Sequence, residues 1–147
     1  MGDEMNTKRL AVGALVGAIA LHGLGYLIFQ LAFANFYAAN VGSATGVPRD
    51  PNLTWAVALG NLSVAVLLTL AIGWARVASI AEGFRIGATV GFLMWFAVDF
   101  IFYGINNVSN LTATIVDPLL ELVHNGITGA IIVAVITRVA PSRSQAV

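Results

Sequence analysis

Cysteine is absent from the chain, and charged side chains are scarce. The first absence excludes disulfides, thiolate metal sites and a thiol nucleophile, and it leaves the redox compartment open. Charged residues make up 10% of the 147 residues, whereas an ordinary soluble domain contains about 25%. The seven basic residues are scattered and the formal net charge is zero. A nucleic-acid-binding protein needs a basic patch or stripe, so no nucleic-acid partner is expected.

Hydrophobic residues take the place of the missing charge, at 59% of the chain with a mean hydropathy of +0.88. They form four long apolar stretches, at residues 10–34, 53–74, 84–103 and 118–139. Each is close to the length of about 20 residues that crosses a bilayer as a helix. The first is too long for the core of a secretion signal, which has about 7–15 residues. The sequence therefore predicts an all-α integral membrane protein, a single domain built as a bundle of four transmembrane helices, with disordered tails at 1–7 and 141–147.

The positions of the basic residues predict the orientation, because lysine and arginine collect in short cytoplasmic loops. Six of the seven basic residues fall on one side of the predicted bundle, namely Lys8, Arg9, Arg76, Arg85, Arg138 and Arg143. Arg49 falls on the other side. Both termini are therefore expected in the cytoplasm, with residues 35–52 and 104–117 facing outward and membrane lipid as a partner.

The two helices that run inward are predicted to open alike, with "DPNLTW" at Asp50 and "DPLLEL" at Asp117. Aspartate accepts hydrogen bonds from the free N–H groups at a helix start, and proline is tolerated at the first helical position. Asp50 and Asp117 are thus predicted to cap the second and fourth helices.

The first and third apolar stretches share a glycine motif, "GALVG" in one and "GATVG" in the other. This similarity favours a bundle made of two duplicated helical hairpins. Small residues four positions apart let transmembrane helices approach closely. We therefore expect the first and third helices to cross at these glycines, or a homodimer to form through Gly13 and Gly17 or through Gly87 and Gly91.

The fourth stretch carries polar side chains at spacings of four, three and four, at Asp117, Glu121, His124 and Thr128. Residues three and four apart lie on one face of a helix, so these side chains form a single stripe. An ionised acid at the membrane centre costs about 2.5–3.5 kcal/mol, and the stripe must therefore face protein or water. The other three stretches each add a polar group at a similar depth, and these groups are His22, Asn61 and Asp99.

The pair Glu121 and His124 is the strongest candidate for chemistry, because an acid and an imidazole one helical turn apart can exchange a proton or share a ligand. Together with Asp99 they are predicted to be the catalytic groups of one outward-facing cavity. The residues predicted to bind a ligand there are His22, Tyr26, Phe29, Asn61, Trp95, Asp117 and Thr128. Other roles stay open for some of these: Asp117 suits a helix cap, Asn61 and Thr128 suit interhelical hydrogen bonds, and His22 suits a core position.

Three functional classes follow. The first is an aromatic-walled pocket that binds a small or lipid-like ligand, with or without acid–base catalysis. The second is a mononuclear site for zinc, iron or manganese, with the ligands His22, Asp99, Glu121 and His124. The stretch "ELVH" has the Glu-x-x-His spacing of metal sites in helical bundles. A di-metal site needs two such pairs, and this sequence has one. The third is a structural or accessory subunit of a larger membrane complex. No cofactor is assigned, and enzymatic activity is left open.

The segments "GATVGFLMWFAVDFIFYG" and "LTATIVDPLLELVHNGITGAII" give the chain a resemblance to small four-span bacterial inner-membrane proteins of unknown function. The resemblance covers about residues 84–132. Asp99 matches an aspartate with aromatic neighbours late in the third helix, and Asp117 matches one that opens the fourth. Glu121 and His124 have no counterpart in this pattern. The resemblance implies a four-helix architecture in a bacterial inner membrane, and it implies no activity.

Overall fold

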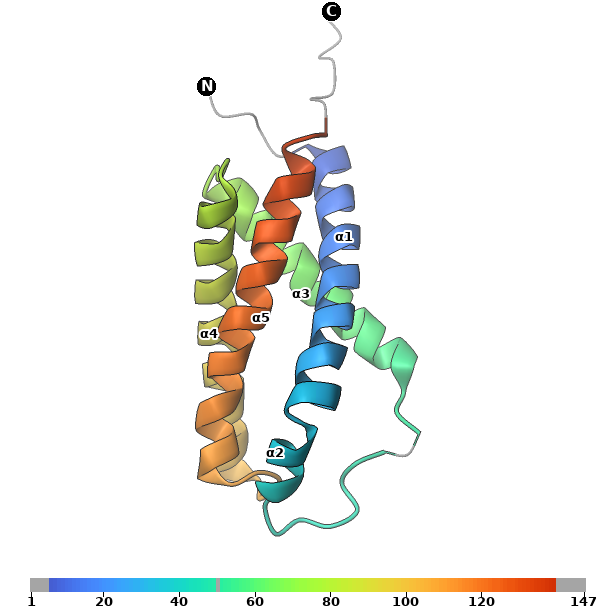
Figure 1. Cartoon of the computed structure of the whole chain (residues 1–147), viewed down its shortest axis with the longest axis vertical. Helices are drawn as coiled ribbons and strands as arrows, with labels where there is room; N and C mark the ends of the chain where they lie inside the picture. The colour runs from blue at the N-terminus through green and yellow to red at the C-terminus, as the bar shows by residue number, and fades with distance from the viewer. Residues whose placement is uncertain (1–5, 50, 140–147) are drawn as a thin grey trace, which may run out of the picture.

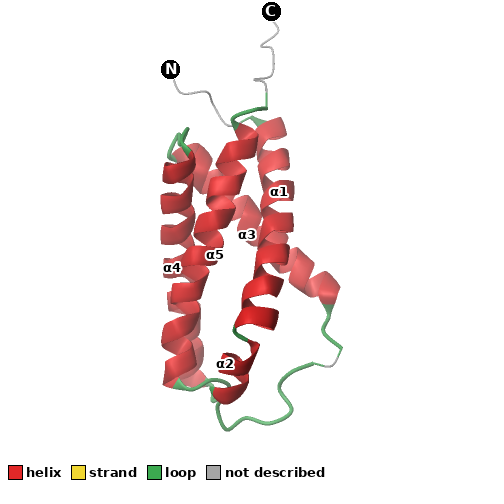
Figure 2. Ribbon diagram, viewed as in Figure 1, coloured by secondary structure: helices red, strands yellow, loops and turns green. Residues whose placement is uncertain are grey.

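The computed structural model describes residues 6–49 and 51–139, which form helices joined by loops (Figure 2). The elements in chain order are α1 (Thr7–Gly25), η1 (Tyr26–Ala32), α2 (Ala34–Ala39), α3 (Thr54–Trp74), α4 (Ile80–Ile105) and α5 (Leu111–Ile136). Four segments are long and apolar enough to cross a membrane, namely Thr7–Ala32, Thr54–Trp74, Ile80–Ile105 and Leu111–Ile136. They confirm the predicted all-α bundle of four transmembrane helices.

The helices are arranged around α5, which lies between α4 and α1 while α3 crosses behind them at a steep angle (Figure 1). The most extensive contacts join α4 to α5, and α1 packs on both α3 and α5. The first and last described residues lie at one end of the bundle, where the Arg9 guanidinium donates to the Val139 carbonyl oxygen at 3.1 and 3.2 Å. The opposite end holds α2 and the 106–110 loop (Figure 1), and it is called the distal end below.

Glycine packing holds α4 against α5. A Cβ atom added at Gly87 would lie 2.2 Å from the Asn125 carbonyl oxygen, and one at Gly129 would lie 2.3 Å from the Gly83 carbonyl oxygen. Only glycine allows backbones to approach this closely. The prediction that the first and third helices cross at their glycines is therefore wrong, because the α4 glycines face α5.

The glycines of α1 are also used inside the bundle. Gly13 packs against Thr69 of α3, and Gly17 packs against Ala65 of α3 and Ile132 of α5. Both are buried, as are Gly87 and Gly91 of α4. None of the four offers an open face for the predicted homodimer. The adjoining apolar core consists of Leu68, Ile72, Ile132, Val133 and Ile136.

Two helix starts differ from the prediction. Helix α5 begins at Leu111 rather than at residue 118, because the Asn110 side chain caps it by accepting from the Ala113 N–H at 3.0 Å. Pro118 lies inside the helix, and Asp117 is consequently no cap. Helix α3 begins at Thr54 after an N-cap residue with no side-chain hydrogen bond, and Asp50 lies outside the described residues.

Other boundaries shift by a few residues. Helix α4 starts at Ile80 instead of residue 84, because Ser79 and Glu82 form a capping box in which each side chain accepts from the other's backbone N–H. Helix α5 ends at Ile136 instead of residue 139. The predicted tails fall outside the described residues except at residues 6 and 7, where Asn6 caps α1 and Thr7 is its first residue.

The distal end of the first membrane-crossing segment is a π-helix, η1, a geometry with a wider turn that is frequent at functional sites. The chain then bends at Phe33, and α2 turns across the bundle. Backbone bonds tie the two distal loops together: Gly42 N–H donates to the Val108 carbonyl oxygen at 2.8 Å, and Asn110 N–H donates to that of Asn40 at 3.0 Å. These bonds hold α2 beside the first turns of α5.

Candidate functional site

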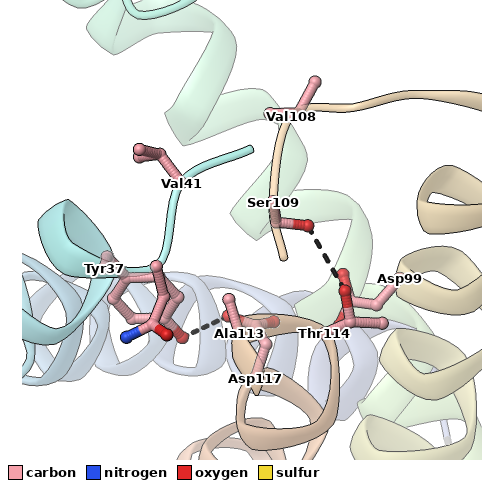
Figure 3. Close-up of a pocket in the computed structure, with 9 residues that line it drawn as sticks. Tyr37, Val41, Asp99, Val108, Ser109, Ala113, Thr114 and Asp117 are labelled. Carbon is pink, nitrogen blue, oxygen red and sulfur yellow. Dashed lines mark hydrogen bonds between the residues drawn. The ribbon is translucent and has the colours of Figure 1, made fainter. Parts of the chain in front are cut away.

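A cavity of about 230 Å³ opens at the distal end, between α2, α4, the 106–110 loop and the start of α5 (Figure 3). Its lining residues are Tyr37, Asn40, Val41, Asp99, Val108, Ser109, Ala113, Thr114 and Asp117. Two of them are acids from different helices, and none is basic. The tied loops and α2 thus bring Asp99 and Asp117 to one space.

Asp117 is bonded to a phenol. The Tyr37 hydroxyl donates a hydrogen bond to Asp117 Oδ1 (Figure 3). Tyr37 lies on α2, outside the four membrane-crossing segments. Burial, followed by this hydrogen bond, raises the pKa of Tyr37 above its ordinary value. The phenol therefore stays protonated and remains a donor to the carboxylate.

Asp99 has an unsatisfied oxygen. Its Oδ2 atom is buried and has no hydrogen-bond partner among the described residues. A buried acceptor without a partner is costly, and a second carboxylate on the same cavity adds repulsion between like charges. A proton or a ligand that carries hydrogen-bond donors or positive charge relieves both effects.

A second cavity of about 340 Å³ adjoins the first. It is lined by Phe29, Gln30, Ala34, Tyr37 and Asp117. The bonded pair of Tyr37 and Asp117 lines both cavities and so stands at the boundary between them. The π-helix supplies Phe29 and Gln30, which links the irregular helix geometry to the cavity wall.

Glu121 and His124 form the predicted pair, one turn deeper along α5. His124 Nδ1 lies 2.8 Å from Glu121 Oε2, and the two side chains are buried. Asn125 Nδ2 donates to the same carboxylate oxygen at 2.7 Å. The other ring nitrogen, His124 Nε2, lies 3.0 Å from the Leu21 carbonyl oxygen of α1.

The surroundings of His124 connect this pair to the π-helix. The imidazole lies against Gly25, at the end of α1, and meets the Phe29 ring edge-on at a centroid distance of 5.7 Å. Phe29 also lines the second cavity, whereas Glu121 and His124 line neither of the two. The pair lies behind the cavity wall and forms no part of its surface.

Several predicted site residues lie elsewhere. Asn61 Nδ2 is 3.3 Å from His22 Nδ1, and this pair is exposed on a face shared by α1 and α3. Tyr26 is 57% exposed, and Trp95 lines neither cavity. Thr128 is buried and donates to the His124 carbonyl oxygen of its own helix at 2.9 Å. The expected single cavity is therefore wrong, because α1 is rotated so that His22 points away from α5.

The predicted metal site is not assembled. Within residues 6–49 and 51–139, no three side chains among histidine, cysteine, aspartate and glutamate are grouped so that they could hold a metal ion. His22 is bonded to Asn61, and His124 is bonded to Glu121, so the two histidines face different neighbours. The four proposed ligands thus split into separate groups.

Sequence reasoning missed the contribution of α2 and the 106–110 loop. Tyr37 and Asn40 lie one turn apart and line the cavity. Ser109 and Thr114 line it as well. The signal for Ser109 was "NVSNLT", residues 107–112, in which asparagine and serine precede an apolar run, as at a helix N-terminus. The bend at Phe33, which places Tyr37, has no comparable signal.

In comparisons with known proteins, no family model, no curated protein and no solved structure matches this chain. The resemblance to four-span bacterial proteins stays a prediction.

Proposed function

We propose that this chain is a small polytopic membrane protein whose distal cavity binds a small or lipid-like ligand through an amine or another group rich in hydrogen-bond donors. The observation that carries the proposal is the buried, unpartnered Oδ2 atom of Asp99 in a cavity that also holds Asp117 and no basic side chain. Such an arrangement offers acceptors and negative charge to a ligand.

The hydrogen bonds of the cavity wall support this choice of ligand chemistry. The Tyr37 hydroxyl is engaged by Asp117, and the Thr114 hydroxyl donates to the Asn110 carbonyl oxygen at 3.0 Å. Asn40 Nδ2 donates to the Phe36 carbonyl oxygen at 2.8 Å. Both hydroxyl donors and one of the two Asn40 N–H donors are already used, while carboxylate acceptors remain. A ligand that donates, such as a protonated primary amine, complements the cavity better than one that accepts.

The residues at the boundary of the two cavities could also take part in acid–base chemistry. The Tyr37 phenol and the Asp117 carboxylate lie at the boundary of both cavities as a proton donor beside an acceptor. A membrane enzyme acting on a lipid-like substrate would use groups of this kind. The binding proposal does not depend on turnover.

The proposed setting is a bacterial inner membrane with the distal end facing outward. The basic residues support this orientation, because Lys8, Arg9, Arg76, Arg85 and Arg138 all lie at or beyond helix ends remote from the cavity. The chain has no cysteine, so single cysteines can report its topology. A membrane-impermeant maleimide should label Ser109→Cys in intact cells and Ala78→Cys only after permeabilisation. The reverse pattern would overturn the orientation.

The ligand is tested by native mass spectrometry of the protein in phosphatidylcholine nanodiscs. One arm adds phosphatidylethanolamine, and the other adds free ethanolamine, so a lipid source is distinguished from a soluble one. We expect an amine adduct in one arm that is lost in Asp99→Asn and Asp117→Asn. Glu82→Gln is the control, because it removes a carboxylate at the other end of α4. No amine adduct in either arm, or equal adducts in all variants, would contradict the proposal.

A second candidate function, as a subunit of a membrane assembly, is favoured by the exposed pair of His22 and Asn61. Hydrocarbon cannot hydrogen-bond to these groups, whereas a second helix can. The neighbouring Gly23 and Gly60 have open space around them, so two copies can approach at this face. Oxidation of Gly60→Cys should then give a disulfide-linked dimer, and Leu93→Cys on the exposed face of α4 should not. A crosslink in neither variant would refute self-association here.

A further inference from the structure

The hydrogen-bond partners of the buried Glu121 and His124 side chains indicate which of their atoms carry hydrogens. The Leu21 carbonyl oxygen, 3.0 Å from His124 Nε2, can only accept a hydrogen bond. Nε2 must therefore carry a hydrogen and donate it. This assignment fixes one end of the imidazole independently of Glu121.

At the other ring nitrogen, His124 Nδ1, two positions are possible for the hydrogen shared with Glu121. His124 Nδ1 and Glu121 Oε2 are 2.8 Å apart, so a hydrogen lies between them. Either Nδ1 carries it, and an imidazolium faces a carboxylate, or Oε2 carries it, and a carboxylic acid donates to a neutral imidazole. Asn125 Nδ2 donates to the same Oε2 atom at 2.7 Å in both cases. Both arrangements contain the same number of protons and no net charge.

We infer that Glu121 and His124 form a buried proton-binding site that holds one shared proton between His124 Nδ1 and Glu121 Oε2. Losing the proton would set two lone pairs against each other and leave a buried negative charge. Adding a second would leave a buried positive charge. Each of these states is costly away from water.

The Glu121 and His124 pair on α5 is also bonded to α1. The bond from His124 Nε2 reaches α1 four residues before Gly25, where α1 gives way to η1. The imidazole, held by Glu121 through Nδ1 and by the Leu21 carbonyl oxygen through Nε2, therefore ties the centre of α5 to the start of the π-helix that contributes Phe29 and Gln30 to the second cavity. This site is independent of the ligand proposed for the distal cavity, and it would exist in a protein that binds no amine.

Nuclear magnetic resonance of the folded protein tests the inference without altering the pair. The chain has two histidines and only three glutamates, Glu4, Glu82 and Glu121, so ¹⁵N-histidine and ¹³C-glutamate labels give few signals. His22→Gln and Glu82→Gln serve only to assign them. At neutral pH we expect either a doubly protonated His124 imidazole or a protonated Glu121 carboxyl, since the shared proton lies between these two groups.

A neutral His124 imidazole beside an ionised Glu121 would overturn the inference, because the pair would then hold no shared proton. This outcome does not bear on the amine-binding experiment, because Asp99 and Asp117 are not part of the measurement.

Discussion

The contact between α4 and α5 predicts the effect of adding a single methyl group. In Gly87→Ala the new Cβ would lie 2.2 Å from the Asn125 carbonyl oxygen and 3.2 Å from the Gly129 Cα atom. Both neighbours are backbone atoms, so no side-chain rotation relieves the overlap. Helix α5 must move away from α4, and the core beyond it must adjust.

The magnitude follows from two opposing effects. Overpacking of a close-packed core costs about 1–3 kcal/mol, and replacing a helical glycine by alanine gains at most about 1 kcal/mol. The overlap with backbone places the cost toward the upper end, so we expect Gly87→Ala to lower the free energy of unfolding by about 2 kcal/mol. Gly104→Ala is the matched control, because a Cβ added there would have no atom within 4 Å apart from its chain neighbours and the backbone of its own helix.

The assay is reversible unfolding in mixed micelles, followed by helix content as the denaturing detergent is increased. Gly104→Ala should unfold with the wild type or slightly later, and Gly87→Ala clearly earlier. If both variants unfolded together with the wild type, the reasoning that glycine sets the approach of α4 and α5 would be refuted.

Two further predictions concern the polar groups. His124→Ala should destabilise the bundle by about 2–4 kcal/mol, because it leaves a cavity and unpaired buried acceptors; His22→Ala, the same change at an exposed histidine, should cost less than about 1 kcal/mol in the same unfolding assay. Since the folded-state pKa of Tyr37 is raised, its neutral phenol stabilises the fold below its ordinary value of about 10 and stops doing so as pH rises further. In an absorbance titration to about pH 11, folded wild type and Tyr37→Phe should therefore give equal tyrosinate signals, and an excess signal in the wild type would contradict the burial of this phenol.

The number of membrane-crossing segments and the polar end of the bundle were predictable, because both depend on local sequence. Apolar runs of the length of a bilayer fixed the four spans, and the spacing of Glu121 and His124 on one helix face predicted their contact. Asp99 and Asp117 were placed at the same depth by their distance from the helix ends, and the structure brings them to one cavity.

The rotation of α1 was not predictable, and this is why His22 was assigned to the wrong face. Nearly every position of this helix is apolar or small, so the sequence gives no stripe that identifies the inward side. The actual side is set by Gly13 and Gly17, which allow the closest approach to α3 and α5. His22 then faces Asn61.

The start of α5 was misplaced for a different reason. "DP" is a frequent helix opening, but here an earlier asparagine caps the helix and the proline is accommodated inside it. The consequence for the site is direct. Asp117, freed from capping, is available to Tyr37, whose position depends on the bend at Phe33.

The central claim is that the distal cavity holds an amine beside Asp99 and Asp117. The rate of maleimide labelling at Ser109→Cys tests this claim most directly. Ser109 lines the cavity, and Ala78→Cys, in the exposed turn between α3 and α4, is the control. In phosphatidylcholine nanodiscs, adding phosphatidylethanolamine or free ethanolamine should slow labelling at residue 109 and leave residue 78 unchanged. The slowing should disappear when Asp117→Asn is combined with Ser109→Cys. Equal labelling rates at residue 109 with and without either amine would contradict the claim.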